Sequence, residues 1–307
     1  MSAPTSSSSA SPLVECAGPH RATLGESPLW HEHEQCLYYV DIAEQQVWRL
    51  DPASGASGHW QLDSQPGCIA LIEGGGLLVA QRNGLWRLDP ASGAHERLAA
   101  PPYDPARQRF NDGKPDAQGR FWVGTIDDAR LPEAALYRFS GGEFRAMGQG
   151  IVTSNGLAWS PDQDQLFWSD TKAHEIYRLP FDPATGELGE RQVFARFEPR
   201  RAEQSLDDYA GRPDGAAVDA QGCYWVAMFE GQRLLRFSPR GELLQTLRLP
   251  VRCPTMPTFG DADLRTLYIT TAREKRPAEE LAAQPWAGGV LKVRVEVPGL
   301  PAARVRL

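Results

Sequence analysis

Short apolar segments rich in aromatic and β-branched residues alternate with polar turns along almost the whole chain. Segments of this length and composition predict β-strands rather than helices. The clearest of them share an aromatic centre and a polar end: "QCLYYVDI" (35–42), "QGRFWVGT" (118–125), "DQLFWSDT" (164–171), "QGCYWVAM" (221–228) and "RTLYITT" (265–271). Because the same pattern returns at regular intervals, the sequence indicates a repeat architecture.

A second type of segment follows each aromatic strand and carries a basic residue near its end. It occurs six times: "QVWRLDP" (46–52), "GLWRLDP" (84–90), "ALYRFS" (135–140), "EIYRLP" (175–180), "LLRFSP" (234–239) and "VLKVRV" (290–295). Turns of the Asp-Pro-x-x-Gly type after several copies predict a fourth, outer strand. Six units of four antiparallel strands describe an all-β, six-bladed β-propeller.

The first strands of the six units are expected near Glu26, Cys68, Asn111, Asn155, Asp214 and Pro257. One interval is longer than the others, and we assign its excess to a loop at 196–211, between the fourth and fifth units. The last unit has no evident fourth strand, whereas "PLVECA" (12–17) precedes the first unit and could complete it. A ring closed in this way has no open edge. We therefore expect one propeller domain over 12–307 and a disordered Ser-rich tail over 1–11.

Composition and charge narrow the partners and the location. The net charge is -7 and basic clusters are short, so we expect no nucleic-acid partner. The opening segment lacks the apolar stretch of a secretory signal, and the chain has no apolar run of membrane-spanning length. The five cysteines form no CxxC pair and are predicted to be free thiols. These features predict a cytoplasmic protein that is a monomer or weak homo-oligomer and has no membrane partner.

The inner strands of a propeller line its central channel, so residues at their starts converge although they are distant in sequence. Glu26, Asn111, Asn155 and Asp214 occupy corresponding positions in four units. Carboxylate and amide oxygens favour a hard divalent cation such as Ca²⁺, Mg²⁺ or Mn²⁺, and Zn²⁺ also accepts such ligands. An isolated Asn-Gly or Asp-Gly pair usually makes only a turn. Recurrence at one position of successive units favours a binding site.

Several motifs occur in the order and spacing of a known family: "GESPLW" (25–30), "RFNDGKPDAQGRFWVGT" (109–125), "SNGLAWSPD" (154–162), "RPDGAAVDAQGCYWVA" (212–227) and "ELAAQPWAGG" (280–289). Together they resemble the SMP-30/gluconolactonase family, which includes regucalcin. The resemblance implies a six-bladed propeller and a sugar-lactone hydrolase. It also implies one divalent cation, most often Ca²⁺, held by Glu26, Asn155 and Asp214, and a substrate-binding pair, Arg109 and Asn111.

The chain departs from the family pattern after "GT" (124–125). Many members have an acidic pair there, with a glutamate that reaches the substrate. This chain has "IDDAR" (126–130), with Asp127 and Asp128 placed earlier and Ala129 at the glutamate position. We expect Asp128 to bind the substrate more weakly, together with a smaller or shifted sugar.

These observations predict a metal-dependent hydrolase that opens an aldonolactone to the aldonic acid, with Asp214 as both cation ligand and catalytic base. Two alternatives use the same residues. One is hydrolysis of phosphotriesters or fluorophosphates, and the other is a non-catalytic, calcium-binding regulatory protein. Arg109 and Asn111 favour an enzyme, because a site for an ion alone does not require them.

Overall fold

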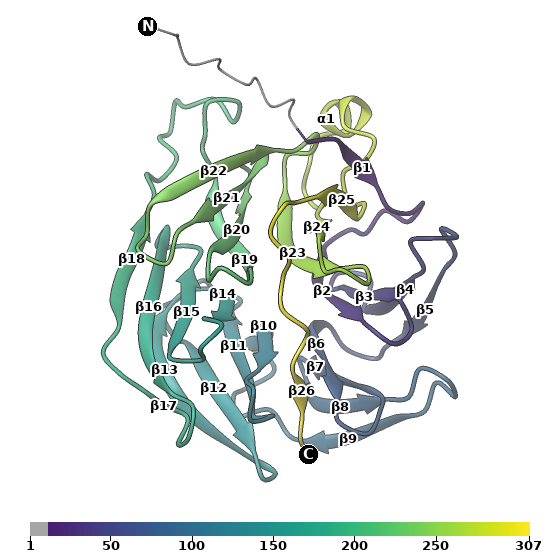
Figure 1. Ribbon diagram of the computed structural model, residues 1–307, viewed down its shortest axis with the longest axis vertical. Helices are drawn as coiled ribbons and strands as arrows, with labels where there is room; N and C mark the ends of the chain where they lie inside the picture. The colour runs from purple at the N-terminus through teal and green to yellow at the C-terminus, as the bar shows by residue number, and fades with distance from the viewer. Residues whose placement is uncertain (1–11) are drawn as a thin grey trace, which may run out of the picture.

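The structure, a computed structural model, describes residues 12–307 and consists almost entirely of small antiparallel sheets arranged in a ring (Figure 1). There are six sheets, of which four have four strands and two have a fifth. The predicted six-bladed β-propeller is therefore confirmed. The predicted tail over 1–11 lies outside the described residues.

Each blade runs from an inner strand at the channel to an outer strand at the rim. Blade 1 contains β2 (Gly25–His31), β3 (Cys36–Asp41), β4 (Gln46–Leu50) and β5 (Ser57–Gln61). Blade 2 contains β6 (Pro66–Ile72), β7 (Leu77–Gln81), β8 (Gly84–Leu88) and β9 (His95–Ala99). Blade 3 contains β10 (Gln108–Pro115), β11 (Phe121–Asp127), β12 (Ala134–Ser140) and β13 (Glu143–Ile151). Blade 4 contains β14 (Ser154–Trp159), β15 (Gln165–Asp170), β16 (Glu175–Asp182), β17 (Glu187–Leu188) and β18 (Gln192–Arg196). Blade 5 contains β19 (Arg212–Val218), β20 (Tyr224–Phe229), β21 (Arg233–Phe237) and β22 (Leu243–Arg248). Blade 6 contains β23 (Pro254–Gly260), β24 (Thr266–Thr271) and β25 (Leu291–Arg294). The inner strands begin within three residues of the predicted starts.

The ring is closed by a strand from the beginning of the described chain. Strand β1 (Val14–Cys16) pairs antiparallel with β25, with Val14 opposite Val293 and Cys16 opposite Leu291. Blade 6 thus takes its outer strand from the N-terminal side and its inner three from the C-terminal side. This pairing confirms the predicted closing strand and covers an edge that would otherwise be open.

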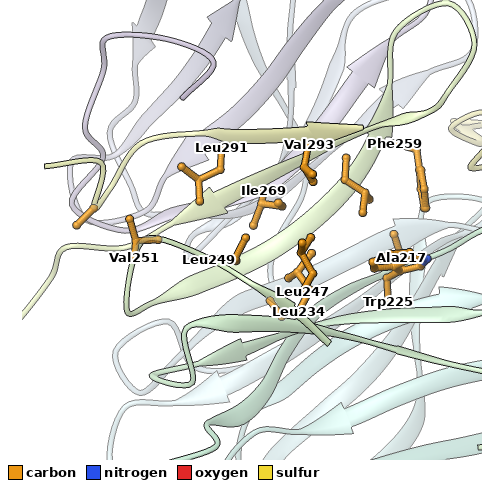
Figure 2. Close-up of a cluster of buried hydrophobic side chains, with 13 residues drawn as sticks. Ala217, Trp225, Leu234, Leu247, Leu249, Val251, Phe259, Ile269, Leu291 and Val293 are labelled. Atoms are coloured by element: carbon orange, nitrogen blue, oxygen red, sulfur yellow. The ribbon is translucent and has the colours of Figure 1, made fainter. Parts of the chain in front are cut away.

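The apolar core is divided among the interfaces between neighbouring blades. Figure 2 shows one such interface, where Leu234 and Trp225 of blade 5 belong to the same buried cluster as Ile269, Leu291 and Phe259 of blade 6. Leu234, Ile269 and Leu291 are completely buried. Because both faces of each sheet are covered by neighbours, the middle strands are apolar on both sides, as β3 and β11 illustrate. This packing fixes the angle between blades and hence the shape of the channel.

A segment that we name the C-terminal strap, residues 296–307, crosses the ring to its opposite side (Figure 1, yellow). Its backbone is hydrogen-bonded to the inner hairpin turns of four blades: Gly299 N to Leu264 O, Ala220 N to Pro298 O, Glu73 N to Val305 O and Arg306 N to Gly119 O. It ends in β26 (Arg304–Val305), which pairs parallel with β6. The sequence did not indicate this strand, which is short and has no repeat partner.

Irregular segments lie where the inner strands begin, at the face opposite the strap. The longest are 197–211, which matches the predicted loop between blades 4 and 5, and the β24–β25 connection, which carries α1 (Ala278–Ala283). Arg252 ties the first of them down by donating to Leu206 O and to Asp207. No helix within residues 12–307 has the length and apolar character needed to cross a membrane.

Ring closure gives a stability prediction. A chain that begins at residue 18 lacks β1 and should melt at a lower temperature than the full chain, by roughly 2–4 °C for each kcal/mol lost in a domain of this size. A chain that begins at residue 12 keeps β1 and should melt like the full chain, because a Ser-rich stretch buries little apolar surface. Differential scanning calorimetry of the three chains measures this. Equal melting temperatures for all three would show that β1 contributes nothing to closure.

Candidate active site and cation site

The inner strands share a β-bulge near their starts, and the candidate ligands are located there. The pairing with the second strand shifts between Glu26 and Leu29 in β2 and between Asn155 and Ala158 in β14. Equivalent shifts follow Phe110 in β10 and Pro213 in β19, so that Asn111 and Asp214 are the first residues inside them. A bulge interrupts the ladder and redirects side chains. The same local irregularity therefore presents a polar side chain to the channel in four blades.

The glycines beside these polar residues are required by the closeness of neighbouring inner strands. Gly156 has φ +63°, and a Cβ atom there would lie 2.4 Å from the hydroxyl oxygens of Ser169 and Tyr224. A Cβ at Gly215 would lie 2.4 Å from the Cβ of Met256 in the next blade. The Asn-Gly and Asp-Gly pairs of the sequence thus combine a polar ligand with the space that convergence of the strands demands.

All four predicted inner-strand residues and Arg109 line one cavity of about 340 Å³ at the channel mouth. This volume is within the range of small-molecule sites, roughly 300–1,000 Å³. The remaining wall is formed by residues from blades 1 and 3 to 6: Leu24, Ile42, Ile126, Arg130, Thr153, Thr171, Lys172, His174, Arg212, Phe229 and Glu274. The structure thus brings together residues that are up to 250 positions apart, from Leu24 to Glu274.

A chain of hydrogen bonds joins the polar residues of blades 3, 4 and 5. Arg109 Nη1 donates to Asn111 Oδ1 at 2.7 Å, and Asn111 Nδ2 donates to Asn155 Oδ1 at 2.7 Å. Asn155 Nδ2 in turn donates to Asp214 Oδ1 at 2.6 Å and to Thr171 Oγ1 at 2.8 Å. These hydrogen bonds link the amides of Asn111 and Asn155 into one network with Arg109 and Asp214.

The two carboxylates of the site have unusual environments. Asp214 is only 6% exposed, and burial raises its pKa to about 8, with the nearby charge of Asp112 acting in the same direction. Loss of solvent also raises the pKa of Glu26 well above its usual range, assisted by the charges of Asp214 and Asp112. Within residues 12–307, no Lys, Arg or His side chain forms an ion pair with either group. For both carboxylates to be ionised together, they need a positive charge that the neighbouring side chains do not supply as an ion pair.

The donor set fits a hard divalent cation. It consists of two carboxylates and neighbouring amides, all oxygen donors, and lacks the Cys or His ligands of a soft-metal site. The part of the chain from 12 to 307 contains no group of three or more His, Cys, Asp or Glu side chains placed to hold a metal ion. The amide of Asn155 would have to supply the third ligand.

Two further charged residues of the channel were not singled out by sequence reasoning. Asp112 is 5% exposed, and its Oδ2 accepts from Leu157 N at 2.8 Å, while its Oδ1 has no hydrogen-bond partner. Lys114 donates to Ala216 O, and burial lowers its pKa. Burial raises the pKa of Asp112. The sequence "NDGKP" (111–115) contained a signal for this pair, since Asp112 and Lys114 are two residues apart and such residues on a strand point to the same side.

Asp128 is placed differently from the other predicted site residues. Its carboxylate accepts from both Arg82 Nη1 and Nη2, at 2.9 and 3.0 Å, and this guanidinium holds its pKa below the usual range. Half of its side chain is exposed, and it is not among the residues that line the cavity. The structure therefore does not bring Asp128 to the other four, and its contact with a substrate remains only a prediction.

A smaller cavity of about 160 Å³ lies at the other end of the channel, beneath the C-terminal strap. Its wall includes Trp30, Trp159 and Lys114 together with Leu300 and Ala302 of the strap. Neither Glu26 nor Asp214 reaches it. The candidate chemistry is therefore confined to the open mouth.

Comparisons with known proteins identify relatives of this chain. The family model described as SMP-30/Gluconolactonase/LRE-like region matches residues 24–273. The 6-deoxy-6-sulfogluconolactonase of Pseudomonas putida is 45% identical over 93% of this chain and 96% of its own length, and regucalcin of Gallus gallus is 34% identical over 94% and 96%. A crystal structure of the calcium-binding protein regucalcin from Agrobacterium tumefaciens matches with a TM-score of 0.90 and 26% identity, over 96% of this chain and 98% of that chain.

The raised pKa values predict how stability depends on pH. In cation-free protein, folded Glu26 and Asp214 keep protons that the unfolded chain has released, so the free energy of unfolding should fall as pH rises from about 5 to about 8. Saturating Ca²⁺ should oppose this fall, and its stabilising effect should grow with pH. Thermal melts across this range, with chelator and with Ca²⁺, measure both effects.

Glu26→Gln should reduce the pH dependence of the cation-free protein to the part that Asp214 contributes, because the neutral side chain has no proton to lose. The matched control is Glu203→Gln in the exposed part of the 197–211 loop, which should leave the dependence as in the unaltered protein. A cation-free protein whose stability rises between about pH 5 and pH 8 would contradict the assignment.

Proposed function

Since this chain belongs to the SMP-30/gluconolactonase/LRE-like family and is a lactonase, we propose that it hydrolyses an aldonolactone to the aldonic acid with one divalent cation bound at the channel mouth. The observation that carries the proposal is the sharing of one cavity by two kinds of residue. Glu26, Asn155 and Asp214, which would hold a cation, line the same cavity as Arg109 and Asn111, which would bind a sugar.

The relatives support both parts of this proposal. The Pseudomonas putida protein is named for a gluconolactone that carries a sulfonate at carbon 6, so the substrates we consider include aldonolactones substituted at that position. The Agrobacterium tumefaciens regucalcin is described as calcium-binding, which favours Ca²⁺ here. Mg²⁺, Mn²⁺ and Zn²⁺ are also compatible with the oxygen ligands.

Glu26, Asn155 and Asp214 would hold the cation, whose positive charge supplies Lewis-acid stabilisation of the negative charge that develops on the lactone oxygen. Glu26 and Asp214, which have no basic partner, would have their charges offset when a cation is bound. The hydrogen bond from Asn111 and the one to Thr171 fix the amide of Asn155. The ligand side chains are thus restrained by neighbours on three blades.

Asp214 is the residue that we propose moves the proton. Its carboxylate takes a proton from a water molecule while the water oxygen bonds to the lactone carbonyl carbon. The bond between that carbon and the ring oxygen then breaks, and the proton passes to the ring oxygen, which becomes a hydroxyl of the open acid. One water is consumed and the ester becomes a carboxylic acid, so the atoms balance.

Arg109 and Asn111 orient the sugar. Both belong to β10, two residues apart, and therefore point to the same side of the strand. Asn111 is anchored by donating to Ser154 O at 2.8 Å and to Asn155. Arg109 donates to Phe110 O and to Asn111, which leaves further N–H groups of its guanidinium for a ligand.

The regucalcin relatives keep a second candidate function open, namely calcium binding without turnover. That function needs Glu26, Asn155 and Asp214 but not the arginine. The two functions differ in whether Arg109 affects a measurable reaction.

The first functional prediction concerns the cation. Exhaustive chelation should abolish lactone hydrolysis, because Glu26 and Asp214 then lose the charge that lets them stay ionised together. Adding back Ca²⁺, Mg²⁺, Mn²⁺ or Zn²⁺ singly should restore it to different degrees, as followed by acid release in a pH-stat with D-glucono-1,5-lactone. Full activity in chelated protein would rule out a cation-dependent reaction.

The second functional prediction concerns the different roles of Asp214 and Arg109 at saturating Ca²⁺. Asp214→Asn keeps the shape of the side chain but removes its charge, so kcat should fall by roughly 10² to 10⁴. Arg109→Ala should mainly raise KM, because a guanidinium that holds the sugar acts in ground and transition states alike. Both variants should bind Ca²⁺ measurably by calorimetry, which separates lost chemistry from a lost cation. Unaltered kcat in Asp214→Asn would assign the base to another residue.

A further inference from the structure

The wall of the active-site cavity carries an excess of positive charge on one side. Arg109, Arg130 and Lys172 line the cavity from blades 3 and 4, and Arg82 of blade 2 lies beside them. Arg82 is neutralised by its paired hydrogen bonds to Asp128. Within residues 12–307, Arg109, Arg130 and Lys172 form no ion pair. Three cationic groups are therefore gathered here without a carboxylate of their own.

Arg130 is held at the cavity by the shape of its loop. The loop joins β11 to β12 and is fastened by buried Asp127, whose Oδ1 accepts from Ala129 N at 2.9 Å and from Leu131 N at 3.3 Å. Arg130 lies between these two anchored residues with φ +59°, a left-handed conformation that non-glycine residues seldom adopt. The turn thus places Arg130 where its side chain lines the cavity.

Lys172 is presented in the same way by the next blade. Asp170 at the end of β15 accepts from Lys172 N at 3.1 Å, and it also accepts from Val152 N and Thr153 N. A backbone bridge between Ile126 and Thr153 joins blades 3 and 4 at this height. Arg130 and Lys172 therefore stand on neighbouring loops of two blades that are directly connected.

The positive charges act on one another, and the charge of Arg109 also acts on Glu26 and Asp214. Burial lowers the pKa of Arg109 to about 10, and the nearby charges of Arg130 and Arg82 contribute to the lowering. Glu26 and Asp214 belong to the cation site at the mouth of the inner strands, and Glu274 enters the cavity from blade 6. Arg212 of blade 5 is paired with Glu230. An unbalanced cationic wall thus remains on blades 3 and 4.

We propose that Arg130 and Lys172, with Arg109 beneath them, form a subsite for an anionic substituent, a sulfonate or phosphate, on the part of the sugar lactone farthest from the reacting carbonyl. This inference rests on the proposed lactonase function and names the part of the substrate that the site selects. Guanidinium and ammonium groups bind such oxyanions by charge-assisted hydrogen bonds, and an arginine can engage two oxygens at once. A neutral aldonolactone would leave these charges unused.

The subsite also fixes the direction in which the substrate binds. The lactone group must face Asp214 and the cation ligands, and its charged end must face blades 3 and 4. The reverse orientation would place the anion away from Arg130 and Lys172 and the lactone group away from Asp214. The substrate is therefore oriented by charge before Arg109 and Asn111 contact its hydroxyl groups.

The test compares three lactones that differ at carbon 6: D-glucono-1,5-lactone, 6-deoxy-6-sulfogluconolactone and 6-phosphogluconolactone. The unaltered protein with Ca²⁺ should show a higher kcat/KM for at least one anionic lactone than for the neutral one. The preferred anion then identifies sulfonate or phosphate as the natural group. Raising salt from about 0.05 M to about 0.5 M should reduce the preference, because screening weakens exposed charge pairs.

Variants assign the preference to residues. Arg130→Ala and Lys172→Ala should each lower the ratio of kcat/KM for the anionic lactone to that for the neutral one by roughly tenfold, the effect of losing one charge-assisted hydrogen bond. Arg130→Lys should lose less, since it keeps the charge without the paired donors. Arg240→Ala is the matched control, because Arg240 lies in the β21–β22 turn on the opposite face, and it should leave the ratio unchanged.

Two results would overturn the subsite. One is hydrolysis in which the anionic lactones have no advantage over D-glucono-1,5-lactone, and the other is an advantage that both alanine variants retain. In either case the proposed lactonase function would stand. If no lactone were hydrolysed, that function would fail, and calorimetric binding of 6-deoxy-6-sulfogluconate against gluconate would still decide the subsite. Equal affinities of the unaltered protein for the two acids would overturn it.

Discussion

Two carboxylates that share the mouth of the channel, Glu26 and Asp214, have no basic side chain in contact, and the arrangement of the site depends on this imbalance. Their charges are unfavourable in a desolvated place, as the raised pKa values of both groups show. They come from blades 1 and 5, so only the closed ring keeps them together. The pairing of β1 with β25 and the apolar packing between blades therefore support the cation site directly.

The propeller divides the site into a floor and a rim. The floor is built by the bulged starts of the inner strands, which supply the cation ligands and the Arg109–Asn111 pair. The rim is built by the loops between the second and third strands, which supply Arg130 and Lys172. Strands held on both sides keep the reacting groups fixed, whereas loops can vary without disturbing the blades. Chemistry and substrate selection are thus assigned to different parts of the same fold.

Aspartates at the ends of second strands connect these two parts. Asp41 accepts from Thr23 N and Leu24 N, which precede the inner strand of its own blade, and Asp170 does the same for Val152 N and Thr153 N. Asp127 instead fastens the rim loop that carries Arg130. A single residue type at one position of the repeat therefore sets the entry of the floor strand or the shape of the rim loop.

The sequence alone determined the number of blades, the starts of the inner strands and the closing strand, because these follow from local patterns repeated at regular intervals. It also placed Glu26, Asn111, Asn155 and Asp214 together, since equivalent positions of a propeller must converge on one axis. It could not determine the pairing of Arg82 with Asp128 or the exposed charges of Arg130 and Lys172. These depend on contacts between loops of different blades.

The C-terminal strap and β26 were decided by tertiary structure for the same reason. The short segment at 304–305 has no repeat partner, and it becomes a strand only because β6 offers an unpaired edge at the channel. The pKa values of Asp112 and Lys114 likewise arise from burial inside the ring. Repeated local patterns specify blades in advance, whereas single contacts and desolvation exist only once the blades have assembled.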